Sequence, residues 1–356
     1  MIPRIKTRFL LLCGMVISIF LVNIPSAKAD IAFPVAERAI FVLDLSGSTD
    51  SKGLWQLGLR PSVINKLSDA FGYPVRKGIS HPKAPTDISV TVIDSNSRLA
   101  PLIKIVSAED SQKIWGLIIN KIGKNPTSIR LNAIVTDFFG ESGAYTELAN
   151  KYLLGDKPPQ HSQSGCQVDA ERALSRGTFM DDVDKELRTD SARTLCEVII
   201  KIAVAMSSAD SIIKDFKCSK SSCSDVVGAV LRTTALAQDA FKRNQNSKMC
   251  IAIASDMINN FPAMTSSSAL NTLRVVKSSK SVEEAEKKGS DAASVASVKF
   301  PIGMKVRVSI IGQGSSSAKG IPIDRMSFLD AYWRGFWNAA GIKSTAQAAS
   351  LSEACY

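Results

Sequence analysis

The sequence has few histidines and lacks the motifs of the common hydrolases. Its 356 residues include only two histidines, His81 and His161, so imidazole has few opportunities to act as a general base. It contains no His-Glu-x-x-His, no Gly-x-Ser-x-Gly and no phosphate-binding Gly-x4-Gly-Lys-Ser/Thr loop. These absences argue against enzymatic activity, and we expect a binding or structural protein.

Blocks of basic residues are also missing. The sequence has 44 Lys and Arg against 33 Asp and Glu, but the basic residues are scattered in ones and twos, as at Lys242-Arg243 and Lys287-Lys288. There is no arginine-rich block and no alternation of basic with aromatic residues, so the pattern favours a solvated basic surface. We expect no nucleic-acid binding.

Only one apolar run approaches the length of a membrane span, and it lies near the N-terminus. The run from Phe9 to Ile24 follows three basic residues and precedes Ala27-Lys28-Ala29, which is the pattern of a secretory signal peptide. It is shorter than the roughly 20 residues that a spanning helix prefers. We therefore expect residues 1–29 to be removed and the protein to be exported, to the periplasm or the extracellular space. Membrane contact is expected only if this segment is retained.

Cysteine is present in a number that permits disulfides after export. Seven cysteines occur in all, and removal of the signal leaves Cys166, Cys196, Cys218, Cys223, Cys250 and Cys355. Six cysteines allow 15 pairings, and the sequence does not choose among them. Cys218 and Cys223, close together in a Lys/Ser-rich turn, are the best candidates for one bridge, whereas Cys250 opens an apolar segment. No Cys-x2-Cys pair supports a zinc site.

Strand and helix patterns alternate along the chain. Strands are predicted at residues 39–43, 88–93, 129–135, 250–254 and 305–311, and residues 99–106 are predicted to return as a partner of the second strand. Helices are predicted at residues 54–71, 111–122, 171–187, 194–206, 226–241, 278–298 and 328–340. This order predicts an α/β protein with a three-layer, Rossmann-like fold, in which helices flank a mostly parallel sheet. We interpret residues 125–188 as an insertion.

Two of the apolar strands end at acidic residues. The strand at residues 39–43 is followed by Asp44-Leu45-Ser46-Gly47-Ser48, and the strand at 250–254 by Ser255-Asp256. Because ligands of parallel sheets bind at the carboxyl ends of the strands, both acids are expected at the functional edge. Carboxylate and hydroxyl oxygens are the hard ligands that magnesium requires.

At this point the chain resembles the von Willebrand factor type A (vWA) family, in which Asp-x-Ser-x-Ser after the first strand forms the metal-ion-dependent adhesion site. The resemblance covers residues 36 to about 345. It implies a vWA-like domain at residues 30–345, interrupted by the insertion, with a tail at 346–356. It also implies that Ser46 and Ser48 bind Mg²⁺, or Mn²⁺ or Ca²⁺, through their hydroxyls, and that Asp44 binds mainly through water.

The family supplies two further ligands from later loops. A threonine that opens a helix matches Thr194 best, with Thr189 as the runner-up, although a hydroxyl that only caps its helix is an equal alternative for Thr194. An acid after a later strand matches Asp256, for which Asp137 competes and a simple turn is the alternative. The family has glycine where this chain has Met257, which leaves the path of that loop open.

There are three candidate functions, and the third belongs to a different family that also has an acid at the end of its first strand. The first is capture of a partner protein through an acidic side chain that completes the coordination of the metal. The second is a structural subunit of a secreted or envelope assembly, without metal-dependent capture. The third is a metal-dependent hydrolase of the haloacid dehalogenase kind, which needs a second acid where this chain has Ser46. We expect the first function and no enzymatic activity.

Overall fold

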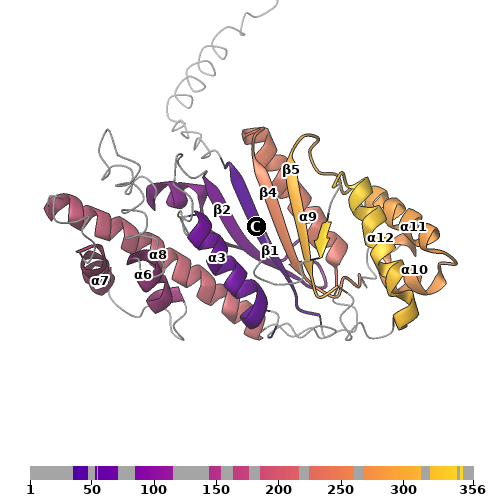
Figure 1. Cartoon of the computed structure of the whole chain (residues 1–356), viewed down its shortest axis with the longest axis horizontal. Helices are drawn as coiled ribbons and strands as arrows, with labels where there is room; N and C mark the ends of the chain where they lie inside the picture. The colour runs from indigo at the N-terminus through magenta and orange to yellow at the C-terminus, as the bar shows by residue number, and fades with distance from the viewer. Residues whose placement is uncertain are drawn as a thin grey trace, which may run out of the picture. The chain divides into compact units, whose positions relative to one another are not determined.

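A six-stranded sheet lies at the centre of the fold (Figure 1). The strands are β1 (Glu37–Asp44), β2 (Thr86–Ile93), β3 (Leu102–Val106), β4 (Lys248–Ala254), β5 (Lys305–Ile311) and β6 (Thr345–Gln347). Their order is β3-β2-β1-β4-β5-β6. The β2–β3 pair is antiparallel and the other pairs are parallel, so the predicted mostly parallel sheet is confirmed, as is the return of residues 99–106 beside the second strand.

The computed structural model describes residues 35–46, 53, 55–70, 85–114, 144–153, 163–175, 185–215, 224–259, 268–313, 321–342 and 345–347. Its helices are α3 (Arg60–Ala70), α6 (Ala144–Leu153), α7 (Gln163–Ser175), α8 (Lys185–Asp215), α9 (Val226–Arg243), α10 (Thr272–Ser278), α11 (Val282–Val295) and α12 (Met326–Ala339). A π-helical turn, Trp55–Leu59, leads into α3, and short 3₁₀ turns occur at Ser268–Leu270 and Ile323–Arg325. Residues 108–114 are also helical. The signal segment lies outside the described residues, as does the predicted strand at 129–135.

Apolar side chains on both faces of the central strands explain the layered arrangement. In β1, Phe41 and Leu43 pack in a core with side chains of α3 and α8. The alternate residues Ile40 and Val42 pack in a second core with side chains of α9 and α12. Because successive strand residues point to opposite faces, a continuous apolar strand must be covered on both sides. The result is an α/β fold with helices on both faces of the sheet, compatible with a Rossmann-like fold.

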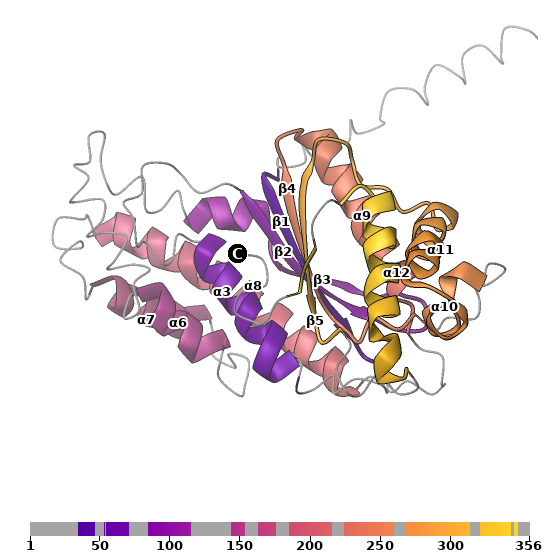
Figure 2. The same cartoon turned by 45° about the vertical axis from the view of Figure 1, so that its right-hand side comes forward.

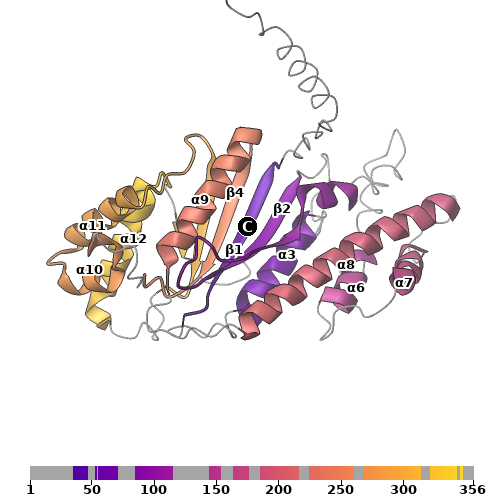
Figure 3. The ribbon, with the colours of Figure 1, turned by 180° about the vertical axis from the view of Figure 1, so that it is seen from behind.

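The helices form two groups, one packed on each face of the sheet (Figures 1 and 2). α10, α11 and α12 lie together beyond β5, and α6 and α7 lie against α8 on the β2–β3 side. Seen from behind, α9 runs beside β4 and α8 extends from the sheet towards α7 (Figure 3). Within the described part of the chain, no helix is both long and apolar enough to cross a membrane.

Several boundaries differ from the predictions. Of the helix predicted at 171–187, residues 171–175 lie in α7 and residues 185–187 in α8, and the residues between lie outside the described part of the chain. α8 begins nine residues before the predicted start at 194. The prediction missed these residues because they are mostly charged and polar and show no apolar periodicity. α10 and β6 were not predicted, and each is short: seven and three residues. β6 also takes in residues that we had expected in the C-terminal tail.

The packing of α12 on α11 depends on two glycines. A Cβ atom on Gly289 of α11 would overlap the carbonyl oxygen of Tyr332, and one on Gly335 of α12 would overlap the carbonyl oxygen of Glu286. The two backbones thus approach each other more closely than side chains would permit. On its other side α12 buries an aromatic cluster: Tyr332, Trp333, Phe336 and Trp337.

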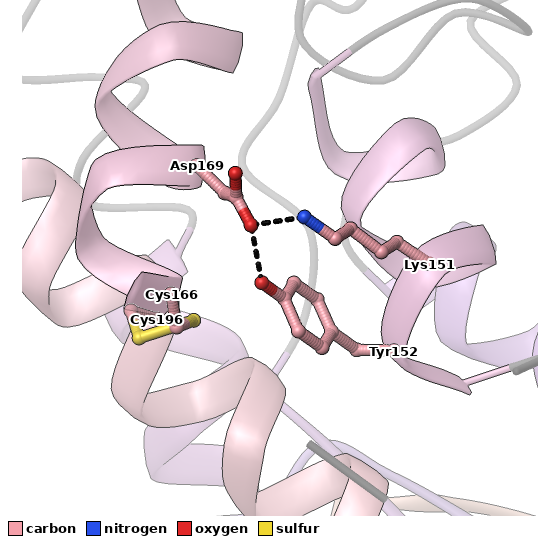
Figure 4. Close-up of a disulfide and its surroundings, with 5 residues drawn as sticks. All are labelled: Lys151, Tyr152, Cys166, Asp169 and Cys196. Carbon is pink, nitrogen blue, oxygen red and sulfur yellow. Dashed lines mark hydrogen bonds and ion pairs between the residues drawn. A yellow bond between two sulfur atoms is a disulfide. The ribbon is translucent and has the colours of Figure 1, made fainter. Parts of the chain in front are cut away.

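A disulfide fixes α7 to α8 (Figure 4). Cys166 of α7 is bonded to Cys196 of α8, with their Cα atoms 5.7 Å apart. Nearby, the Tyr152 hydroxyl donates to Oδ2 of Asp169 at 2.5 Å, and the Lys151 ammonium group donates to the same oxygen. α6, α7 and α8 are therefore joined by a covalent bond and by charged contacts. The predicted Cys218–Cys223 pair lies outside the described residues, and Cys250 is also disulfide-bonded.

Substitution of either interhelical glycine should destabilise the protein. In an exposed helix, Gly→Ala stabilises by about 1 kcal/mol, but at Gly289 or Gly335 the added methyl group must push α11 and α12 apart. We expect Gly289→Ala and Gly335→Ala each to lower the free energy of unfolding by about 1–3 kcal/mol, measured by urea denaturation. Ser294→Ala, on the exposed side of α11, is the control, and equal effects at all three positions would contradict this account of the packing.

Removal of the Cys166–Cys196 bond should loosen α7 more than the sheet. The bond closes a loop of 30 residues, for which loss of the cross-link costs about 3–4 kcal/mol. In a Cys166→Ala/Cys196→Ala variant we expect faster amide hydrogen exchange in α6 and α7 and unchanged exchange in β1 and β4. Ser208→Ala on α8 is the control. A uniform increase over the sheet would show instead that the bond supports the whole domain.

Candidate functional site

Two acidic residues meet where the strand order reverses. β1 ends at Asp44, and β4 ends at Ala254, directly before Ser255 and Asp256. The two strands are parallel neighbours, with Leu43 in register with Ala254. β2, the next strand along the chain, lies on one side of β1, and β4 lies on the other side. A position of this kind, at the carboxyl ends of diverging strands, is the usual ligand site of an open α/β sheet.

The Asp44 carboxylate is buried and accepts hydrogen bonds from three directions. The Ser46 amide donates to Oδ1 at 2.8 Å. The Ser255 hydroxyl donates to Oδ2 at 2.6 Å, and the Ser224 hydroxyl lies 3.4 Å from the same oxygen. Asp44 has no solvent exposure. It therefore joins the end of β1 to the end of β4 and to the segment that precedes α9.

Burial and a second acid both raise the pKa of Asp44. Loss of water around the carboxylate is the larger cause, and the nearby charge of Asp256 adds to it, so that the pKa rises from 3.8 to about 6 despite the Ser255 hydrogen bond. Asp256 is likewise fully buried. Two buried carboxylates close enough to repel each other are stabilised by a shared proton or by a cation.

The loop that carries Asp256 has an unusual backbone. Met257 has a φ of 63°, in the left-handed region that favours glycine. Its amide donates to the Ser255 hydroxyl at 2.9 Å, and its carbonyl accepts a 2.8 Å hydrogen bond from the Trp333 indole of α12. The Ile258 amide donates to Oδ1 of Asp256 at 3.0 Å. The loop thus has a glycine-type backbone at Met257, held there by its neighbours.

The start of α9 completes the edge. Asp225 is the N-cap of this helix and accepts the Gly228 amide at 2.8 Å. Its other carboxylate oxygen accepts the Ser97 amide at 3.2 Å, and burial raises the pKa of this group. Neither Ser224 nor Asp225 was predicted as a site residue. An aspartate directly before an apolar helix is a typical N-cap signal that pointed to this position.

The structure brings together three of the predicted site residues. Asp44, Ser46 and Asp256 lie at the carboxyl edge of β1 and β4, whereas Ser48 and Asp137 lie outside the described residues. Ser255, which was predicted only as part of the loop, donates a hydrogen bond to Asp44 at 2.6 Å, shorter than the 3.4 Å contact from Ser224.

Thr194 is placed elsewhere, and the prediction that it opens a helix was wrong. It is an interior residue of α8, where its hydroxyl donates to the Asp190 carbonyl at 3.0 Å. No glycine or proline interrupts residues 185–194, so the helix continues through this segment. The alternative Thr189 lies in the same helix. At the edge itself, the hydroxyl from a later segment belongs to Ser224.

Among the described residues, the donors at the edge are oxygen atoms. Two carboxylates, Asp44 and Asp256, lie with the hydroxyls of Ser46, Ser224 and Ser255. No three His, Cys, Asp or Glu side chains are grouped for metal binding in the described part of the chain. The residues fit a hard divalent cation in charge and in donor type, with hydroxyls in the place of further carboxylates.

The chain matches none of the known protein families, none of the curated proteins and none of the solved structures with which it was compared. Its function is therefore inferred from this site.

Ionisation of Asp44 should make stability depend on pH in the absence of metal. Because its pKa is raised, the folded protein keeps a proton between about pH 4 and 6 that the unfolded chain releases, so stability falls as the pH rises through this range. At about 1.4 kcal/mol per pKa unit, the change from 3.8 to about 6 corresponds to about 3 kcal/mol.

The Asp44→Asn variant should lack this dependence. With chelator present, we expect it to be more stable than the wild type above pH 6, by up to about 3 kcal/mol, and to have a flatter stability profile between pH 4 and 6. Urea denaturation at several pH values measures both. Asp239→Asn, on the exposed side of α9, is the control, and an unchanged slope in Asp44→Asn would contradict the raised pKa.

Proposed function

We propose that this chain is an exported vWA-like protein that captures a partner protein through a divalent cation, Mg²⁺ or Mn²⁺, at the carboxyl edge of β1 and β4. One observation carries the proposal. Asp44 and Asp256 are both fully buried, each at the end of its own strand, and the charge of Asp256 acts on Asp44. Asp44, Ser46 and Asp256 would hold the cation, together with Ser48.

Charge balance favours a cation at this edge. Two carboxylates buried together repel each other, and the pKa of Asp44 is raised mainly by desolvation and further by this repulsion. A divalent cation would neutralise both without a proton. If Asp44 binds it through water, the cation keeps enough charge to attract a carboxylate from a partner.

Three further features support the resemblance to the vWA family. The Asp-x-Ser-x-Ser segment follows a strand that is central in the sheet. Met257 has a positive φ, which favours glycine, at the position where the family has glycine. The aromatic helix α12 closes the fold and contacts the acidic loop through Trp333. The Cys166–Cys196 disulfide is compatible with export.

A scaffold role, without metal-dependent capture, is the second candidate, and one observation favours it. Asp44 already accepts hydrogen bonds from the Ser46 amide and from the Ser255 and Ser224 hydroxyls. The edge is thus well hydrogen-bonded from within, and the same contacts would serve to fix the loops of a structural subunit. The two roles differ in whether binding requires a metal.

Metal binding by the purified protein tests the first step. We expect Mg²⁺ and Mn²⁺ to bind the wild type at a single site in calorimetric titration, and Asp44→Ala to abolish binding while the circular dichroism spectrum stays unchanged. Asp256→Ala should weaken binding at least tenfold, because one of two carboxylates is lost. Asp239→Ala is the matched control. Unchanged metal affinity in Asp44→Ala would remove the proposal.

Capture of a partner tests the second step. The mature protein, immobilised, is incubated with the envelope fraction of its native cells, once with Mg²⁺ and once with chelator. We expect a protein that is retained with Mg²⁺, lost with chelator and not retained by Asp44→Ala. Retention that is equal under all three conditions would favour the scaffold role.

A further inference from the structure

A second site lies at the opposite end of the sheet from the acids. A cavity of about 640 Å³ opens where β1, β4 and β5 begin. The first residues of these strands, Glu37, Lys248 and Lys305, are in register with one another and all line it. Its volume lies within the range of about 300–1,000 Å³ that is common for small-molecule sites.

Three cationic side chains line this cavity. Lys248 and Lys305 are direct neighbours across the β4–β5 pair, and Arg307 lies two residues further along β5, on the same face as Lys305. All three are exposed. No hydrogen bond or ion pair joins any of their side chains to another described residue. Like charges directly opposite each other in a sheet are destabilising, so an anion between them would stabilise this edge.

The acid that lines the same cavity is already paired. Glu37 accepts a hydrogen bond from the Lys66 ammonium group of α3 at 2.6 Å, and the Lys66 side chain is almost fully buried. Glu37 is therefore held by a cation outside the cavity lining. The lining keeps a positive excess that Lys248, Lys305 and Arg307 provide.

The rest of the lining is largely apolar. Phe300, Met304, Val306 and Ile342 contribute to it, and Phe300 and Ile342 are otherwise buried. Ile302, in the turn between two lining residues, is 86% exposed. A cavity with cations on one side and apolar side chains on the other is complementary to a molecule with an anionic end and an apolar end.

We propose that this cavity binds a small amphiphile with an anionic head group, a phosphate or a carboxylate. The Lys248, Lys305 and Arg307 side chains bind the head group, since ammonium and guanidinium groups form charge-assisted hydrogen bonds with both kinds of anion. Met304 and Val306 contact the apolar part. Because the cavity lies at the amino ends of the strands, binding does not require the cation proposed at Asp44.

Titration with octyl phosphate, below its micelle concentration, tests the proposal. We expect saturable binding to the wild type by calorimetry, and at least tenfold weaker binding to the Lys248→Gln/Arg307→Gln variant. Lys287→Gln, an exposed lysine of α11 outside the cavity, should bind as the wild type does. Octyltrimethylammonium, which has a cationic head, should not bind. Binding of both amphiphiles alike, or unchanged affinity in the double variant, would overturn the proposal.

Two further arms separate the contributions. Inorganic phosphate should bind at least tenfold more weakly than octyl phosphate. Met304→Gln should weaken the binding of octyl phosphate and leave that of inorganic phosphate unchanged. The circular dichroism spectrum shows whether each variant is folded. Equal affinity for inorganic phosphate and octyl phosphate would contradict the proposal that the ligand has an apolar part. The octyl phosphate titration repeated with chelator should be unchanged, so its outcome is independent of the acidic edge.

The natural source of the anion is distinguished with vesicles. If the head group belongs to a lipid, the wild type should sediment with phosphatidylglycerol vesicles and not with phosphatidylcholine vesicles, and Lys248→Gln/Arg307→Gln should remain in solution. If octyl phosphate binds and neither vesicle does, the site takes a free small anion. If the wild type sediments with both kinds of vesicle, and the double variant does so as well, the protein binds membranes without using this cavity.

Discussion

The parallel pairing of β1 with β4 is the constraint on which the acidic edge depends. It brings the end of one strand beside the end of another that lies some 200 residues later in the chain. Asp44 and Asp256 are thereby buried in the same place, where each carboxylate raises the free energy of ionising the other. The hydroxyls of Ser255 and Ser224 offset part of that cost by hydrogen bonding to Asp44. A shift of register between the two strands would separate these groups.

The sheet could be predicted from the sequence because its strands are buried on both faces. Runs such as Ile40–Leu43 are apolar at every position, which is typical of a strand covered on both faces. The acids that follow these runs indicate the carboxyl edge of the sheet. Short elements were harder, since three residues such as those of β6 carry no pattern of their own. The position of Gly341 after α12, with a φ of 94°, agreed with the predicted end of that helix.

The site could be predicted only in part, for a physical reason. Asp44, Ser46 and Asp256 follow strands directly, so their position depends on the sheet alone. Ser224 depends instead on where a long helix ends and the next begins, and that boundary is a property of tertiary packing. Thr194 was misplaced because a threonine hydroxyl can either cap the start of a helix or donate to the carbonyl four residues earlier within one, as it does here. The hydrogen bond from Trp333 to Met257 joins segments that no local pattern relates.

The close approach of α11 and α12 at Gly289 and Gly335 limits how the edge of the molecule moves. With backbone pressed against backbone, neither helix has room to slide or rotate past the other. We therefore expect the two helices to move together. Since Trp333 of α12 donates to the carbonyl of Met257, any displacement of the acidic loop that keeps this hydrogen bond must carry both helices with it.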